Sequence, residues 1–161
     1  MQLLKFVLST LALAPSLCRA VVGPGVVTGN TAVHDPTMCK DSRGTYFVFS
    51  TAPGIEIRTS TDRTAWTLVG KVWPNGAPWT DAYTGTSNGN LWAPDCTVIG
   101  NTFYLYYSAS SFGSQKSATF FAKSTTGLPG SWSDQGLVTQ TSSSNTYNVC
   151  TRIGLPISHL T

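Results

Sequence analysis

Two stretches of this chain repeat the same order of strand-like segments, and this repeat constrains the fold more than any other feature. The first opens at Asp35-Pro36 and the second at Pro94-Asp95, so the two aspartates lie sixty positions apart. Each unit continues with a short strand, a turn, an aromatic strand, another strand, and a tryptophan followed by a last strand. Four-stranded units that recur at this scale are typical of β-propeller blades.

The strand pattern covers most of the chain. Runs rich in Val, Ile, Thr, Tyr, Phe and Trp alternate with clusters of Gly, Pro, Asn and Ser, and no 3.6-residue period occurs beyond the N-terminal segment. The fold class is therefore all-β. Predicted strands cover 45–51, 54–60, 66–73, 96–99, 101–110, 117–124 and 136–139, and 74–90 reads as a long connector. Because blades bury their faces against neighbours around a ring, two blades predict part of a larger propeller.

The composition of the chain excludes some classes of function. Charged residues make up only 11% of the 161 residues, and the net charge of +3 includes no Lys/Arg run, which argues against a nucleic-acid partner. Glu56 is the single glutamate, so acid–base chemistry has few carboxylates available. Because Glu56 alternates with Ile55 and Ile57, we predict that it faces solvent.

Residues 1–20 are predicted to be a secretory signal peptide. Lys5 precedes an apolar core, and Ala20 with Cys18 forms a small-residue cleavage site. The core is too short to span a bilayer, so we expect a secreted, extracellular protein without a membrane association. The alternative is an N-terminal anchor that is never removed.

An exported chain would keep Cys39, Cys96 and Cys150, an odd number whose spacing fits no metal motif. A Cys39–Cys96 disulfide is one arrangement, and buried apolar thiols are the other. The sequence does not decide between them.

Three motifs offer chemistry. The strand that opens a blade lines the central channel, so Asp35 is either a general base there or a turn residue that binds backbone amides. In LWAPD, Trp92 has a flat apolar face that suits a sugar ring, and Asp95 would point into the same channel. The alternative is structural: Trp92 packs in the core, and Asp95 belongs to a turn. In SSFGS, Phe112 could lie over a ligand, and Gly113 would let the backbone approach that ligand closely. The alternative is that this loop is an ordinary hairpin turn.

A family resemblance rests on several motifs that occur in order: HDPT, GTYFVFST followed by GI, LWAPD, FYLYYSASSFGS, GSW and YN. They resemble the start of secreted endo-1,5-α-L-arabinanases of glycoside hydrolase family 43 over residues 30–148. The resemblance implies a five-bladed β-propeller, of which this chain holds about two blades plus the start of a third. It also implies inverting endo-hydrolysis of α-1,5-linked arabinofuranose chains in pectin. The expected partner is plant cell-wall arabinan, and the protein is expected to be a monomer.

The resemblance assigns roles to individual residues. Asp35 matches the general base, Trp92 and Phe112 match aromatic positions of the sugar subsite, and Gly113 and Asn148 match positions near the substrate. Asp95 matches a residue that we interpret as structural or subsite-lining. No cofactor is expected in this chain, although the family allows a central metal ion in full-length members.

The resemblance stops after Asn148. Where the family continues with an Asp that tunes the catalytic acid, this chain has Thr151, and the acid Glu and the late His of the family have no counterpart. We therefore expect residues 21–148 to be the N-terminal part of the propeller and 149–161 to be an unrelated tail, produced by a frameshift or a retained intron. The chain is expected to be inactive as it stands.

Other functions remain open. Within the same family, β-xylosidase or α-L-arabinofuranosidase activity is the runner-up. A non-catalytic fragment could instead bind polysaccharide through Trp92, Phe112 and Trp79. A third alternative is a product without function.

Overall fold

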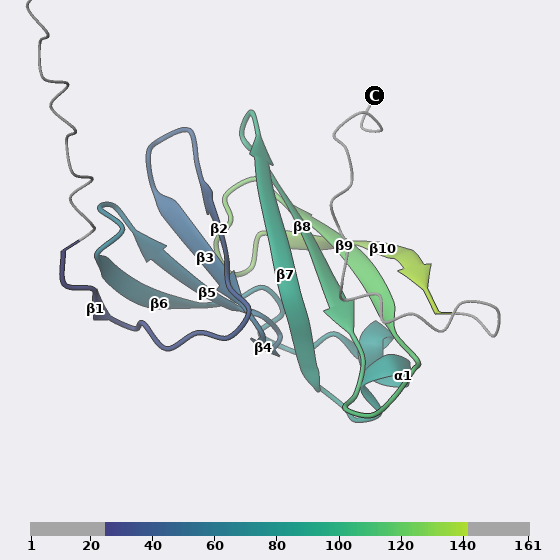
Figure 1. The fold of residues 1–161 in the computed structure, drawn as a ribbon. Helices are drawn as coiled ribbons and strands as arrows, with labels where there is room; N and C mark the ends of the chain where they lie inside the picture. Colours follow the sequence, from purple (N-terminus) through teal and green to yellow (C-terminus); the bar gives the residue numbers. More distant parts are fainter. Residues whose placement is uncertain (1–24, 142–161) are drawn as a thin grey trace, which may run out of the picture.

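The computed structural model describes residues 25–141, and in them almost all regular structure is β (Figure 1). Two five-stranded sheets lie side by side, in the orders β1-β6-β5-β3-β2 and β10-β9-β8-β7-β4. Neighbouring strands are antiparallel, except for the parallel pair β1 and β6. The strands are β1 (Thr28–Gly29), β2 (Thr37–Lys40), β3 (Tyr46–Ser50), β4 (Ala52–Pro53), β5 (Glu56–Ser60), β6 (Ala65–Lys71), β7 (Asn90–Ile99), β8 (Thr102–Ala109), β9 (Ala118–Ser124) and β10 (Trp132–Gln140).

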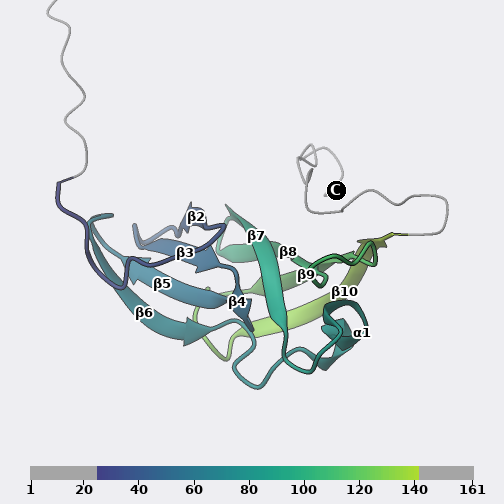
Figure 2. The same cartoon turned by 60° about the horizontal axis from the view of Figure 1, so that its bottom comes forward.

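The all-β prediction is confirmed, and the four long strands of each repeat unit lie in one sheet, which is one blade of a partial propeller. In the turned view, β3, β5 and β6 of the first sheet lie on the left, and β8, β9 and β10 of the second sheet lie on the right (Figure 2). The predicted start of a third blade lies outside the described residues, as do the predicted signal peptide and the tail at 149–161.

The second blade differs from its prediction at its first strand. The expected short strand at 96–99 is the end of a ten-residue strand, β7. The connector before it contains a 3-10 helix, η1 (Pro78–Thr80), and a single helical turn, α1 (Asp81–Thr84). Gly85, with φ of 72°, ends that turn by donating its N–H to the Asp81 carbonyl. A four-residue helix is too short to leave a detectable 3.6-residue period.

A short strand from the first repeat unit pairs with the second blade. The chain leaves β3 of the first blade at Ser50, and two residues later it forms β4, which pairs with Leu91 and Asn90 of β7 in the second blade. Thr51 is the one residue between these two strands. This strand exchange was not predicted, and it brings the end of the first aromatic strand to the beginning of β7.

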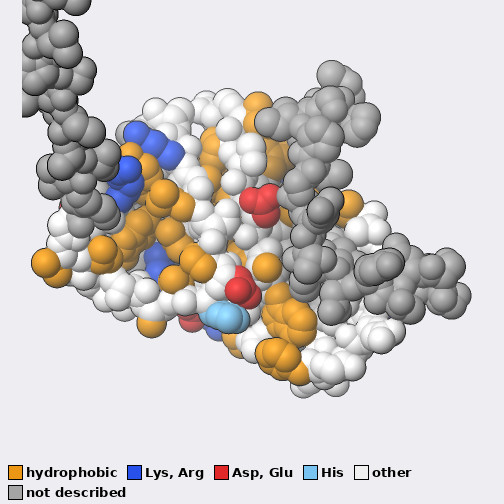
Figure 3. Space-filling view, viewed as in Figure 1, with side chains coloured by type: hydrophobic (Ala, Val, Ile, Leu, Met, Phe, Trp, Pro, Cys, Tyr) orange, Lys and Arg blue, Asp and Glu red, His pale blue; other side chains and the backbone are white. Residues whose placement is uncertain are grey.

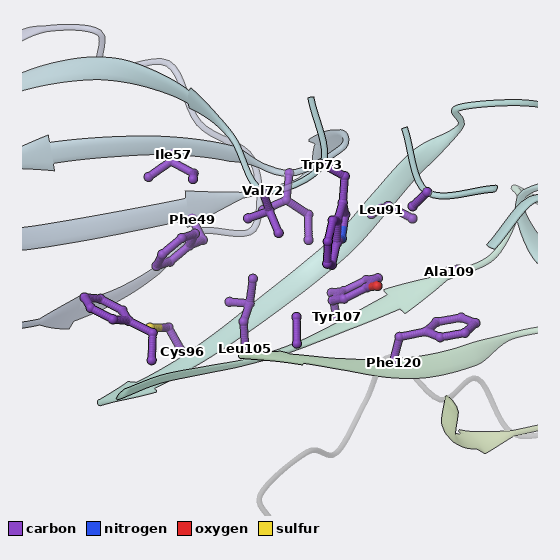
Figure 4. Packing of buried hydrophobic residues seen from close by; sticks show 14 of the residues in the cluster. Phe49, Ile57, Val72, Trp73, Leu91, Cys96, Leu105, Tyr107, Ala109 and Phe120 are labelled. Atoms are coloured by element: carbon purple, nitrogen blue, oxygen red, sulfur yellow. The ribbon is translucent and has the colours of Figure 1, made fainter. Parts of the chain in front are cut away.

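The core lies between the blades. Along β8, Leu105 and Tyr107 are fully buried and the intervening Tyr106 is half-buried, as the alternation of a strand with one buried face requires. Phe49 of β3 faces them from the first blade, and Figure 4 shows side chains of both sheets pointing toward one another. The edge-to-face pair of Phe47 and Phe103 also joins the blades, with ring centroids 4.8 Å apart.

The open question about the cysteines is answered by a disulfide between Cys39 of β2 and Cys96 of β7. The same two strands share a hydrogen bond of 3.2 Å from the Cys96 N–H to Thr37 Oγ1. The first strands of the two repeat units are therefore joined both covalently and by a hydrogen bond.

The prediction that Glu56 faces solvent is wrong in part. Its side chain is only 29% exposed and pairs with Arg58, whose Nη2 lies 2.7 Å from Glu56 Oε2. Arg58 is buried and also donates to the carbonyls of Asn30 and Ala32. Because a buried guanidinium requires such partners, this pair fastens the segment before β2 to the first blade.

Candidate functional site

Asp35 lies in the segment that leads into β2, and its carboxylate is held at one oxygen. Thr51 Oγ1 donates to Asp35 Oδ2 over 3.2 Å, and His34 Nε2 lies 3.4 Å from the same oxygen. The Thr51 N–H also donates to the His34 carbonyl over 2.9 Å. The Asp35 side chain is 46% exposed, so it remains open to water and to a ligand.

The LWAPD motif forms a bulge at the beginning of β7. Trp92 lies opposite Ser108 and Asp95 opposite Tyr106, so β7 has one residue more than β8 over this interval. The bulge turns the backbone at Ala93, which has φ of 42° and donates its N–H to Thr51 Oγ1 over 2.9 Å. The motif that was predicted to open the second blade therefore meets the segment that opens the first.

Two aromatic side chains lie beside this bulge. The rings of Trp92 and Phe112 have centroids 5.2 Å apart and are tilted by 39°, and Phe112 is 92% exposed. Phe112 belongs to the loop between β8 and β9, so the loop is a hairpin connection and also presents an aromatic face. The Phe112 ring is therefore open to contact with a ligand.

The aromatic pair borders a shallow hollow of about 170 Å³. Its remaining lining is polar and comes from the connector, from the first residue of β7 and from the β8–β9 loop: Thr84, Thr86, Gly89, Asn90, Ser110 and Ser111. Gly113, in the same loop, has φ of 78°, and no atom lies within 4 Å of the position where a Cβ would stand. Apolar faces among hydroxyl and amide groups suit a sugar ring, which has both apolar and hydroxyl surfaces.

On the molecular surface, an acidic side chain and a histidine side chain lie together, with a patch of hydrophobic side chains beside them (Figure 3). Two other carboxylates bind partners elsewhere in the first blade. Asp41 binds Arg43 and the Thr45 N–H, and Glu56 binds Arg58. These two acidic groups therefore stabilise turns and strands rather than serving the site.

The other predicted site residues have different outcomes. Asn148 lies outside the described residues. Asp95 is an exposed residue of β7 directly after the bulge. Trp79, considered as a third sugar-facing ring, is 37% exposed, donates its Nε1–H to the Tyr107 hydroxyl and packs edge-to-face on Trp73. Burial raises the pKa of Tyr107 far above its ordinary value, so this hydroxyl stays neutral.

Sequence reasoning missed Thr51. It lies at the end of the motif GTYFVFST, but only the fold brings it between Asp35 and Ala93. Within residues 25–141, no group of three or more His, Cys, Asp or Glu side chains is arranged to hold a metal ion. The same residues contain no helix that is long and apolar enough to cross a membrane.

One end of the two blades thus carries a half-exposed carboxylate and a pair of aromatic rings. Among known proteins, the model of glycosyl hydrolases family 43 matches residues 26–148 of the chain. The chain belongs to this family.

Curated relatives carry names that refer to arabinan. A probable arabinan endo-1,5-α-L-arabinosidase C of Aspergillus flavus is 41% identical over 131 residues, which cover 80% of this chain and 40% of that protein. The extracellular endo-α-(1→5)-L-arabinanase 1 of Bacillus subtilis is 35% identical over 147 residues, which cover 87% of this chain and 46% of that protein. The chain thus spans less than half the length of these relatives.

Solved structures show the same likeness. A family 43 endo-arabinanase from Bacillus licheniformis has a TM-score of 0.68 and 32% identity, over 77% of this chain and 43% of that one. The α-L-arabinanase of Cellvibrio cellulosa complexed with arabinohexaose has a TM-score of 0.62 and 37% identity, over 68% of this chain and 36% of that one. The partial-propeller architecture is therefore shared with experimentally known members of the family.

Proposed function

We propose that this chain carries the arabinan-binding surface and the water-activating carboxylate of a site for hydrolysing α-1,5-linked arabinofuranose chains. One observation carries the proposal. The hydrogen bonds from Ala93 to Thr51 and from Thr51 to Asp35 hold a half-exposed carboxylate next to the bulge that presents Trp92 and Phe112. The arabinan-directed names of the relatives support the choice of sugar.

The mechanism follows from inverting glycoside hydrolysis. One carboxylic acid protonates the leaving oxygen, and a carboxylate about 6.5–9.5 Å away activates water on the opposite face of the sugar. Asp35 is the carboxylate that activates water, and it accepts a proton from that water while the oxygen attacks the anomeric carbon. Trp92 and Phe112 stack on the sugar and hold the anomeric carbon in line with the water.

The family resemblance assigns no residue of this chain to the other half of this pair. The chain's single glutamate, Glu56, is bound to Arg58 in the first blade, and Thr151 stands where the family has its tuning aspartate. We therefore expect the chain as it stands to bind arabinan without cutting it. The N-terminal pattern of residues 1–20, and the extracellular Bacillus subtilis relative, support secretion as the route to a polysaccharide substrate.

Affinity electrophoresis in gels that contain debranched arabinan or xylan tests the proposal, together with an assay for released oligosaccharides. We expect arabinan to retard the chain and to release no oligosaccharide. Trp92→Ala and Phe112→Ala should weaken binding about 5- to 10-fold through lost stacking. Leu137→Ala, an exposed hydrophobic residue of β10, is the matched control and should leave the retardation unchanged.

Stronger retardation by xylan would favour the xylosidase alternative. A folded chain that arabinan does not retard would overturn the proposal. Release of arabino-oligosaccharides that is lost in Asp35→Ala would show that the chain does not need an acid from elsewhere.

A further inference from the structure

We infer that Thr51 is the positioning residue of the candidate base: its hydroxyl holds Asp35 Oδ2 and leaves Oδ1 to take the proton from water. This inference rests on the proposed function and adds to it a residue to which the sequence motifs gave no role. Thr51 touches neither sugar nor water in this scheme, so it acts through Asp35.

The direction of the hydrogen bonds at Thr51 is determined by chemistry. The Ala93 N–H can only donate, so Thr51 Oγ1 accepts it at 2.9 Å. The hydroxyl has one proton, and this proton is directed to Asp35 Oδ2 at 3.2 Å. The two hydrogen bonds, from the Ala93 amide to the Thr51 hydroxyl and from that hydroxyl to Asp35, therefore point the same way and polarise each other. Asp35 Oδ2 is the final acceptor.

The two oxygens of Asp35 consequently differ. Oδ2 faces both Thr51 Oγ1 and His34 Nε2, whereas Oδ1 has no hydrogen-bond partner within the part of the chain that the structure describes. A base needs an oxygen with a free lone pair directed at the water. Oδ1 fits this requirement, and Oδ2 serves as the anchor that prevents the carboxylate from rotating.

Backbone conformation adds independent support. Asp35 and Ala93, the two residues that Thr51 joins, have φ of 45° and 42°, in the left-handed region that residues other than glycine rarely adopt. Such conformations cost free energy and persist where the surroundings hold them, most often at functional sites. Thr51 binds both residues by its hydroxyl and reaches the His34 carbonyl by its N–H.

The location of Thr51 explains why one hydroxyl can bind both Asp35 and Ala93. It is the single residue between β3 of the first blade and β4, which pairs with β7 of the second. Any shift between the blades would move Asp35 relative to Trp92, and the Thr51 hydroxyl bridges the two segments where that shift would occur. Thr51 therefore couples the base to the sugar-binding ring.

The test compares Thr51→Val, which keeps the shape and removes the hydroxyl, with Thr51→Ser, which keeps the hydroxyl. Because the chain lacks an evident acid, turnover is measured on a dinitrophenyl glycoside of 1,5-linked arabinobiose, whose leaving group departs without protonation. The matched control is Thr119→Val, since Thr119 is buried and its hydroxyl has no partner within residues 25–141.

We expect Thr51→Val to lower kcat about tenfold or more and to change KM less than about twofold, because the lost hydrogen bond acts on the base rather than on sugar binding. Thr51→Ser should restore most of kcat, and Thr119→Val should resemble the unaltered chain. In 1H–15N spectra, the Ala93 amide should shift and exchange faster in Thr51→Val and keep its position in Thr119→Val.

Each contrary result has its own meaning. If the unaltered chain releases no more dinitrophenolate than Asp35→Ala, the proposed function is wrong and the role of Thr51 falls with it. If the chain is active and Thr51→Val is equally active, the proposed function stands and the inference about Thr51 is wrong. An unaffected Ala93 amide in Thr51→Val, or a Thr51→Ser variant as slow as Thr51→Val, also overturns the inference.

Discussion

At the scale of single residues, Asp62 shows how one carboxylate organises a turn. Its Oδ1 accepts the Thr64 and Ala65 N–H groups at 2.7 and 2.9 Å and the Ser60 hydroxyl at 2.9 Å, between β5 and β6. The hydrogen bonds from Ala65 and then Thr64 hold the pKa of Asp62 far below its ordinary value of 3.8. Ionised Asp62 therefore stabilises the turn more than protonated Asp62 does.

The consequence is a dependence of stability on pH. Because folding lowers this pKa, the contribution of Asp62 is complete above its unfolded pKa and is lost as the pH falls toward the lowered value. We expect the urea midpoint of the unaltered chain to exceed that of Asp62→Asn at pH 7, with the difference shrinking below about pH 4. Asp134→Asn removes an exposed carboxylate of β10 and serves as the control. A difference that stays constant down to about pH 2.5 would contradict this account.

Residues differ in how far the sequence reveals them. Asp35, Trp92 and Phe112 lie in motifs, and the structure brings these motifs to one end of the blades. Their catalytic and binding roles remain predictions. The role of Thr51 was not predictable, because a threonine at the end of a strand has no distinct pattern until the fold places positions 35, 51 and 93 together.

At the scale of elements, the joined strands β2 and β7 set the geometry of the site. The disulfide between Cys39 and Cys96 closes a loop with a sequence separation of 57. That loop includes Thr51 and begins just after Asp35, so it fixes the path of the chain on which both residues lie. The sequence left this pairing open because cysteine spacing alone does not report which strands are neighbours.

We predict that Cys39→Ala/Cys96→Ala lowers the free energy of unfolding by about 4 kcal/mol, the chain-entropy value for a loop of this length. Urea titrations with and without dithiothreitol measure the effect. The reductant should destabilise the unaltered chain by a similar amount and leave the double variant unchanged. A reductant effect that persists in the double variant would show that it does not come from the Cys39–Cys96 disulfide.

Short elements were the least predictable part of the fold. The long strands followed from alternation, whereas β4 has two residues and α1 has four. β4 exists because β7 offers Leu91 and Asn90 as pairing partners, which is a tertiary cause rather than a local one. These two short elements adjoin the site, since β4 follows Thr51 directly and Thr84 of α1 lines the hollow.

At the scale of the whole molecule, the two blades share one core. Gly127, in the turn between β9 and β10, has φ of 73°, and a Cβ there would stand 2.7 Å from the Phe103 ring and 3.0 Å from Phe47. Phe47 belongs to the first blade and Phe103 to the second, so the absent side chain at Gly127 lets the two rings meet. Because the contact crosses between blades, its loss should affect both blades at once.

This contact allows the coupling between the blades to be measured. Gly127→Ala adds a methyl group between the rings, whereas Gly130→Ala places one in the same turn at φ of 79° with no atom within 4 Å. Both substitutions carry the cost of a left-handed alanine, about 1–2 kcal/mol. Gly127→Ala should cost about 1–3 kcal/mol more through overpacking.

If the blades unfold as one unit, tryptophan fluorescence and far-UV circular dichroism should give one coincident urea transition, shifted further in Gly127→Ala than in Gly130→Ala. Equal shifts would mean that the interface relaxes around the methyl group, and two separate transitions would mean that the blades fold independently.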